Sequence, residues 1–194
     1  MLLNLSVIAI GYLLGSIPSA YIMSKLRKGI DIRDVDTGNM GAGSVIRQVG
    51  LWEGIVVIIA DVAKGAAAIL IAQALGVSLF WVLGAGLAAL LGHNFPVYVG
   101  FRGGQGMATI IGIFLILDPM AMAIVFAIMA VALLVTRQIF STIAIAGPFL
   151  PLIVWLLGGS AILILYSLVI VVVSLSRNVY RLKEVKERIV RNKE

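Results

Sequence analysis

The sequence predicts an all-α, polytopic membrane protein with seven transmembrane helices and glycine-rich cytoplasmic loops, folded as a single domain over residues 1–194. Three observations lead to this prediction. Hydrophobic residues make up 61% of the chain and charged residues only 12%, a balance typical of proteins whose solvent is the bilayer. The apolar residues fall into seven blocks. When these blocks are threaded through a membrane, nearly all basic residues lie on one side of it.

The seven blocks are the predicted spans, because a spanning helix needs about 20 largely apolar residues. They run over 3–24, 54–76, 79–97, 107–117, 119–136, 141–157 and 160–176. The first block is expected to be retained, since no basic residue precedes Lys25 and the positive region of a signal peptide is missing. The block 107–117 is too short to cross alone. Either its helix begins within 103–106, or the loop before it enters the membrane.

Basic residues determine the predicted orientation. With the N-terminus outside the cell, 14 of the 15 lysines and arginines lie on the cytoplasmic side, and Lys64 lies within a span. Because Lys and Arg are enriched in cytoplasmic loops, the C-terminus is assigned to the cytoplasm. Basic loops beside anionic lipid account for the net charge of +6, so nucleic acid is not an expected partner. The tail 177–194 alternates charges at helical spacing and is interpreted as a membrane-surface helix.

The residue types that the chain lacks exclude several kinds of site. It has no cysteine and one histidine, which excludes disulfides, a cysteine nucleophile and a cysteine or histidine metal cluster. No metal is therefore expected. His93 has no aspartate four residues after it, so the His–Asp arrangement of some acyltransferases is missing. It is either a hydrogen-bonded anchor at the membrane interface or a catalyst.

Two predicted cytoplasmic loops are rich in glycine and polar side chains. The first contains Thr37-Gly38-Asn39-Met40-Gly41-Ala42-Gly43-Ser44 followed by Arg47, and the second contains Arg102-Gly103-Gly104-Gln105-Gly106. Glycine lets main-chain N–H groups approach a ligand, and arginine binds phosphate in bidentate fashion. The second loop also precedes a helix, whose first N–H groups attract anions. The loops predict a phosphate site without Walker spacing; flexible connections between spans are the alternative.

Two further groups of polar residues lie within or at the end of spans. Asp61 and Lys64 are three residues apart on one helical face. Isolated charges at this depth are costly, so they are either an ion pair that fixes helix packing or part of a substrate site. Ser174, Arg177, Asn178 and Arg181 end the last span, where they either complete a polar pocket or form an ordinary interfacial stop.

At these motifs the chain resembles the PlsY family, the bacterial membrane acyl-phosphate:glycerol-3-phosphate acyltransferases. The first-loop motif of the family, S-G-N-x-G-A-T-N-x-x-R, is similar to Thr37 through Arg47, and G-H-x-[YF]-P-V-F-x-x-F-K-G-G-K-G-V-A-T is similar to Gly92 through Thr109. The family's D-x-x-K-G is matched by Asp61, Lys64 and Gly65. The opening Leu14-Gly15-Ser16-Ile17-Pro18-Ser19 also agrees.

The chain departs from the family pattern at several polar positions. Gln105 replaces the second lysine of G-G-K-G, and Gly43-Ser44 replaces Thr-Asn. The family's serine motif is matched only loosely around Arg137–Thr142, which includes Ser141. The last motif, R-H-x-x-N-I-x-R-L, keeps Asn178 and Arg181 but loses its arginine and histidine.

The resemblance implies transfer of a fatty-acyl group from acyl phosphate to the sn-1 hydroxyl of glycerol-3-phosphate, giving lysophosphatidic acid for phospholipid synthesis. It implies a monomer in the bacterial inner membrane, with membrane lipid as a partner and without a cofactor. Ser44, His93 and Asn178 are the expected catalytic residues. The expected substrate-binding residues are Thr37, Gly38, Asn39, Gly41, Arg47, Lys64, Arg102, Gly103, Gly104, Gln105, Gly106, Ser141 and Arg181.

Two other functions compete with this one. A small anion transporter would use Asp61 and Lys64 to mark a permeation path. Against that function, most polar residues lie on one side, and the second half of the chain does not repeat the first. A relative with another acceptor, or a noncatalytic protein on the same fold, is suggested by the charges missing at Gln105 and Leu175.

Overall fold

The structure, a computed structural model, describes residues 1–35, 38–136 and 146–191, with side chains for 1–35, 38–135 and 146–177. These residues are helical and contain no strand, which confirms the predicted all-α class. The helices are α1 (Leu2–Ser16), α2 (Ser19–Lys28), α3 (Ala42–Gln48), α4 (Leu51–Ala74), α5 (Leu79–Asn94), η1 (Val97–Val99), α6 (Met107–Leu117), α7 (Pro119–Thr136), η2 (Gly147–Phe149), α9 (Leu150–Leu156) and α10 (Ala161–Arg191).

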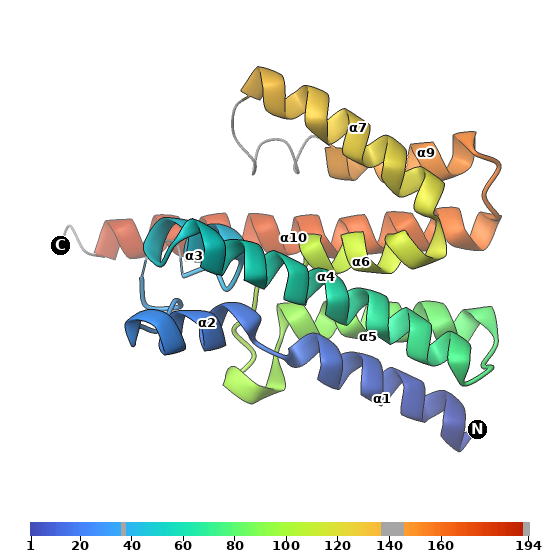
Figure 1. The fold of residues 1–194 in the computed structure, drawn as a ribbon, viewed down its shortest axis with the longest axis horizontal. Coiled ribbons are helices and arrows are strands. Elements are labelled where there is room, and N and C mark those ends of the chain that lie inside the picture. The colour runs from blue at the N-terminus through green and yellow to red at the C-terminus, as the bar shows by residue number, and fades with distance from the viewer. Residues whose placement is uncertain (36–37, 137–145, 192–194) are drawn as a thin grey trace.

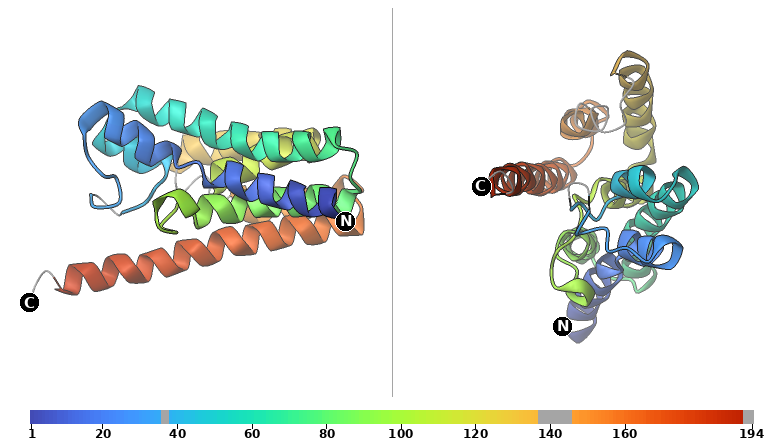
Figure 2. Two further views of the ribbon diagram at one scale, coloured as in Figure 1. Left: turned by 90° about the horizontal axis from the view of Figure 1, so that it is seen from below. Right: turned by 90° about the vertical axis from the view of Figure 1, so that its left-hand side faces the viewer.

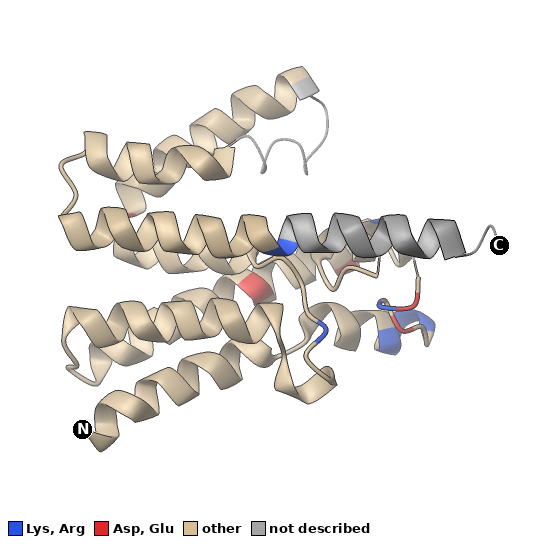
Figure 3. Ribbon diagram, turned by 180° about the vertical axis from the view of Figure 1, so that it is seen from behind, with Lys and Arg blue, Asp and Glu red and all other residues tan. Residues whose placement is uncertain are grey.

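The long helices lie side by side, and the two termini lie at opposite ends of the bundle (Figure 1). The turns after α4, α6 and α9 lie at the N-terminal end, whereas α2 and α3 lie at the other. Charged residues gather toward that second end among the described residues (Figure 3). We call it the polar end. It contains the first loop, defined as the described residues 29–35 and 38–41, and the second loop, defined as residues 95–106.

Seven apolar stretches of the described residues correspond to the seven predicted blocks. Three are long enough to cross a membrane: Leu2–Lys28, Leu51–Ala74 and Leu79–Val99. Four are shorter: Met107–Leu117, Pro119–Val135, Gly147–Leu156 and Ala161–Arg177. The start of the sixth block, 141–145, lies outside the described residues.

Two predicted element boundaries are wrong. The first block is not one helix: the chain leaves helical geometry at Ile17 (ψ 115°) and resumes as α2 after Pro18. Proline disfavours helical geometry in the residue before it, which explains the break. The predicted boundary at Arg177 is not a helix boundary: the predicted helix is present, but it continues α10, which runs from Ala161 to Arg191 and extends past the other helices (Figure 2).

Small residues bring the helices close together around the polar end. A Cβ on Gly15 of α1 would collide with the Ala89 carbonyl of α5, and one on Gly65 of α4 with the Thr109 carbonyl of α6. Close backbone approach of this kind is the usual packing mode of membrane helices, where lipid removes the hydrophobic drive for association. As a result, α5 and α6, which flank the second loop, are packed against α1 and α4.

Candidate functional site

Ser44 and Arg47 of the first predicted motif come together in α3. Gly41 is the residue before this helix, and Ser44 lies fully buried in its first turn. Arg47 lies one turn later, and its Nη2 donates to the Ser44 hydroxyl at 3.4 Å. Arg47 itself is exposed, so its guanidinium can reach a ligand from the solvent side. Gly38 has φ +69° and turns the chain just before Asn39.

The second loop leads into α6. Gly103, Gly104 and Gly106 are buried, and Gly106 adopts φ +83°, directly before Met107 begins the helix. The prediction that the glycine run lies at a helix N-terminus is confirmed. Of the two explanations for the short block 107–117, the earlier helix start is wrong, because residues 102–106 are not helical.

The two loops meet, as predicted. A Cβ on Gly104 would lie 2.8 Å from the Met40 carbonyl of the first loop and would collide with Nε2 of His93. Arg33 makes a second connection, since its Nη1 donates to the Val99 carbonyl at 2.6 Å. That an anion lies between the loops stays a prediction.

Asp31 holds Arg33 in place. Its carboxylate accepts hydrogen bonds from Nε (2.9 Å) and Nη2 (2.6 Å) of Arg33. These bonds lower the pKa of Asp31 from its ordinary value, against the opposing effect of burial, and raise the pKa of Arg33. A lowered folded-state pKa means that the pair stabilises the fold above the unfolded pKa of Asp, about 3.9. That stabilisation is lost as the pH falls through the folded pKa.

Buried polar side chains at the polar end lack protein partners within the described part of the chain. They include Asn39 through Oδ1, Asn94 through both amide atoms, and Thr109 through its hydroxyl. Unsatisfied buried groups of this kind are rare in native proteins and mark places where a ligand, ion or water binds. Asn94 lies beside the second loop, because a Cβ on Gly106 would lie 2.9 Å from its Oδ1. The sequence analysis placed Asn39 in the site but missed Asn94, which stands in an apolar run.

Asp61, Lys64 and His93 form a buried chain of contacts. Lys64 Nζ lies 2.8 Å from Asp61 Oδ1, and His93 Nδ1 lies 3.7 Å from the same oxygen. Lys64 also donates to the Ile17 carbonyl at 3.1 Å, at the break between α1 and α2. The structure therefore shows the predicted ion pair and connects it to the α1–α2 break. Direct contact of Lys64 with substrate stays a prediction.

The last helix closes one side of the second loop. The Ser174 hydroxyl donates to the Gln105 carbonyl at 2.8 Å, and Arg177 Nη2 donates to the Asn94 carbonyl at 3.2 Å. The Arg177 guanidinium also lies over the Phe95 ring, 4.5 Å from its centroid. The sequence analysis named Ser174 and Arg177 as possible members of a polar pocket, but it did not count them among the expected catalytic or substrate-binding residues.

The remaining predicted site residues are exposed, partly buried or outside the described part. Arg102 is exposed in the second loop, and the Gln105 side chain is partly buried. Thr37 and Ser141 lie outside the described residues, as do the side chains of Asn178 and Arg181. Their assignments stay predictions.

An apolar pocket of about 500 Å³, including its open mouth, borders the second loop. It lies among α6, α7, α10 and the segment 147–150, and its walls include three methionines, Met107, Met122 and Met129. Ser174 lines the pocket as well and contacts Gln105. The pocket and the glycine loop are therefore neighbours.

Comparison with known proteins identifies the family. The family model described as glycerol-3-phosphate acyltransferase matches residues 5–185 of the chain. The chain belongs to the glycerol-3-phosphate acyltransferase family. This finding excludes the small transporter as the family assignment.

Relatives and solved structures agree with this membership. A glycerol-3-phosphate acyltransferase of Parasynechococcus marenigrum is 43% identical over 170 residues, which cover 87% of this chain and 80% of that protein. One from Geobacter sulfurreducens is 36% identical over 187 residues, covering 95% and 96%.

The crystal structure of PlsY (YgiH), an integral membrane glycerol 3-phosphate acyltransferase, has the same fold. Its glycerol 3-phosphate form matches with a TM-score of 0.84 at 31% identity, covering 98% of this chain and 94% of that one. Its lysophosphatidic acid form matches with a TM-score of 0.80 at 29% identity, covering 98% and 93%. The chain is an integral membrane protein of this acyltransferase family.

Arg33→Met tests the connection between the two loops of this acyltransferase. The variant loses hydrogen bonds from a charged donor to the Val99 carbonyl and to Asp31. We expect the free energy of unfolding in detergent at neutral pH to fall by about 1.5–3 kcal/mol, the usual value of such bonds. The difference from the wild type should shrink as the pH falls through the lowered pKa of Asp31.

Arg27→Met is the matched control for this variant. Arg27 pairs with Glu53 at 2.8 Å, but its side chain is 63% exposed, and exposed ion pairs contribute about 0–1 kcal/mol. Equal losses in the two variants would contradict a specific role for Arg33.

Proposed function

We propose that this protein transfers a fatty-acyl group from acyl phosphate to the sn-1 hydroxyl of glycerol-3-phosphate, producing lysophosphatidic acid and inorganic phosphate. The observation that carries the proposal is the meeting of two glycine-rich loops beside an apolar pocket at the polar end. The loops offer N–H donors and arginines for phosphate, and the pocket offers an apolar environment for an acyl chain. One site thus has the two environments that an acyl phosphate requires.

Phosphate binding is supported by the chemistry of the loops. The first N–H groups of α6 have no acceptor within the helix, and a helix N-terminus attracts anions. Arg47 and Arg102 are exposed at the same end of the bundle, where a soluble phosphate can reach them. Asn39 and Thr109 add buried polar atoms without protein partners in the described part. Gly104 does not offer its N–H to phosphate, because that N–H is bonded to the His93 carbonyl at 3.1 Å.

Acyl phosphate suits a site of this composition. Its carbonyl carbon is already activated, so the acceptor hydroxyl attacks it directly and the C–O bond to phosphate breaks. Phosphate leaves with the bonding electrons and takes up the proton of the hydroxyl. Neither an acyl-enzyme nor a cofactor is needed in this scheme. The protein's tasks are then to orient two phosphates and to stabilise charge in the transition state through N–H donors and arginines. Ser44, with its hydroxyl next to Arg47, is proposed to contact one of the phosphates.

The proposed orientation places the polar end in the cytoplasm of a bacterium, with the N-terminus outside. Basic residues concentrated at that end support it. Glycerol-3-phosphate then enters from the cytoplasm and the acyl chain from the bilayer. The proposed functional unit is a monomer.

Reporter fusions after Gly50 and after Glu194 should both register as cytoplasmic; an external signal from either would contradict this orientation.

Gln105→Lys tests the acceptor. If glycerol-3-phosphate is the acceptor, a lysine here adds a charge beside the bound phosphates. Catalytic efficiency with glycerol-3-phosphate should then rise about ten- to hundredfold, the value of one charge-assisted contact of roughly 1.5–3 kcal/mol. Efficiency with glycerol should not rise. The measurement compares both acceptors with purified wild-type and variant enzymes.

Tyr98→Lys is the control for added charge near the loops, because Tyr98 lies in η1 and is 57% exposed. It should leave the acceptor preference unchanged. A wild-type enzyme that prefers glycerol over glycerol-3-phosphate would contradict the proposed reaction.

A further inference from the structure

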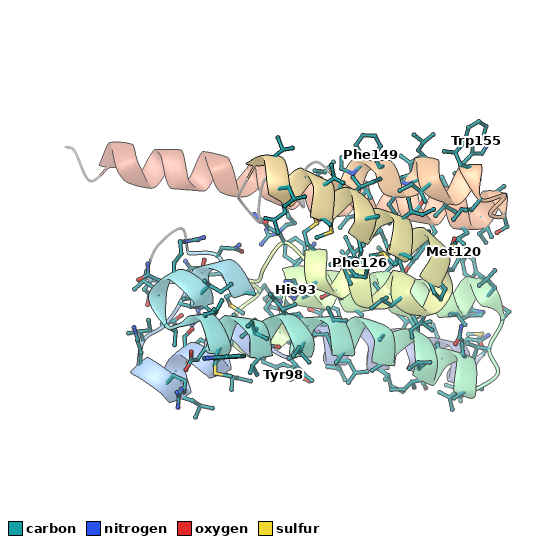
Figure 4. The ribbon with its side chains drawn as sticks, turned by 45° about the horizontal axis from the view of Figure 1, so that its top comes forward. His93, Tyr98, Met120, Phe126, Phe149 and Trp155 are labelled. Carbon is teal, nitrogen blue, oxygen red and sulfur yellow. The ribbon has the colours of Figure 1, made fainter. Side chains whose placement is uncertain are left out.

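His93 occupies an enclosed position behind the second loop. Only 7% of the residue is exposed, and Figure 4 shows it in the interior of the bundle, away from outward-facing aromatic residues such as Trp155. One ring nitrogen, Nδ1, lies 3.7 Å from Asp61 Oδ1. The other, Nε2, lies where a Cβ on Gly104 would collide with it. The imidazole thus lies between Asp61 and the second loop.

The imidazole is anchored through Asp61. The Asp61 carboxylate is fixed by Lys64 at 2.8 Å, and Lys64 is fixed in turn by the Ile17 carbonyl at 3.1 Å. The charges of Asp61 and Lys64 balance each other, as buried charges within a membrane require. The Asp61 carboxylate lies 3.7 Å from Nδ1 of the ring, a distance of electrostatic contact rather than of a hydrogen bond. The chain of contacts therefore runs from the α1–α2 break to the second loop.

Proton transfer is the alternative role for His93. A general base must lie about 2.6–3.2 Å from the proton donor, or be connected to it by one water. In this structure the Nε2 atom lies against the second loop, where a Cβ on Gly104 would collide with it, and the Gly104 N–H is bonded to the His93 carbonyl. The residue thus contacts Gly104 through both its side chain and its main chain.

We propose that His93 is a positioning residue, which fixes the second loop through Gly104 so that the phosphate donors keep their geometry. The inference rests on the proposed acyl transfer and concerns the same site. Under it, a side chain at position 104 displaces the loop because the imidazole occupies that space. Removal of the imidazole loosens the loop and leaves the chemical groups of the reaction in place.

A double-mutant cycle tests the contact. Gly104→Ala should raise KM for glycerol-3-phosphate more than it lowers kcat. Adding His93→Ala should recover part of that loss, about threefold or more, the coupling expected of residues in contact. Recovery is partial because the Met40 carbonyl, 2.8 Å from the same Cβ position, remains.

Gly103→Ala supplies the matched control. A Cβ there would collide with the main-chain carbonyl of His93 and would lie 2.6 Å from the Pro96 ring, away from the imidazole. His93→Ala should therefore recover nothing when it is combined with Gly103→Ala. Equal recovery in both combinations, or none in either, would overturn the positioning role.

The pH profile separates positioning from proton transfer. His93→Asn keeps a donor that can face Asp61, and it should lower kcat less than tenfold and preserve the shape of the kcat/KM profile. Loss of one limb of that profile, with a kcat decrease of about 10²–10⁴-fold, would overturn the inference in favour of a general base.

Thermal unfolding of the cycle in detergent provides a readout independent of activity. The melting temperatures should show the same coupling of His93 with Gly104 and not with Gly103. A wild-type enzyme inactive on glycerol-3-phosphate, with this coupling intact, would overturn the proposed function alone. An active wild type with additive variants would overturn the positioning inference alone.

Discussion

The ion pair between Lys64 and Asp61 is the constraint on which the polar end depends. Both residues lie in α4, and the residues around them in that helix are apolar. An unpaired charge in this position is costly, so each needs a partner at this depth. The pair also reaches beyond its own helix, to the Ile17 carbonyl at the α1–α2 break and to His93 of α5. One electrostatic requirement thereby fixes three helices relative to one another beneath the two loops.

The two loops are positioned by contacts with these helices. Gly104 fits between His93 and Met40 only because it has no side chain, and Arg33 connects the first loop to Val99. Ser174 supports the second loop from α10 and also lines the apolar pocket. A rigid arrangement of donors matters here because, under the proposed function, the enzyme accelerates the reaction of an already activated donor mainly by orienting two substrates.

The fold was largely predictable, because hydropathy alone marks helices in a protein whose solvent is the bilayer. The break after Ile17 was missed because the apolar run continues through Pro18, although proline itself signals it. The meeting of the loops followed from their common side of the membrane. The contacts of Arg33 with Val99 and of Ser174 with Gln105 end on main-chain carbonyls, which leave no pattern in the sequence. The role of His93 was ambiguous from the sequence, because the proposed role depends on Gly104 lying against its ring. That contact leaves no pattern in the sequence either.

Acyl transfer by the purified protein in detergent tests the central claim most directly. Acyl phosphate and glycerol-3-phosphate are supplied without coenzyme A, and lysophosphatidic acid and inorganic phosphate are measured together. The account predicts that the two products form in equal amounts. It also predicts that acyl phosphate consumption beyond the background hydrolysis rate requires the acceptor. Lysophosphatidic acid formed from acyl-CoA but not from acyl phosphate would contradict the account, and so would enzyme-dependent phosphate release without acylated product.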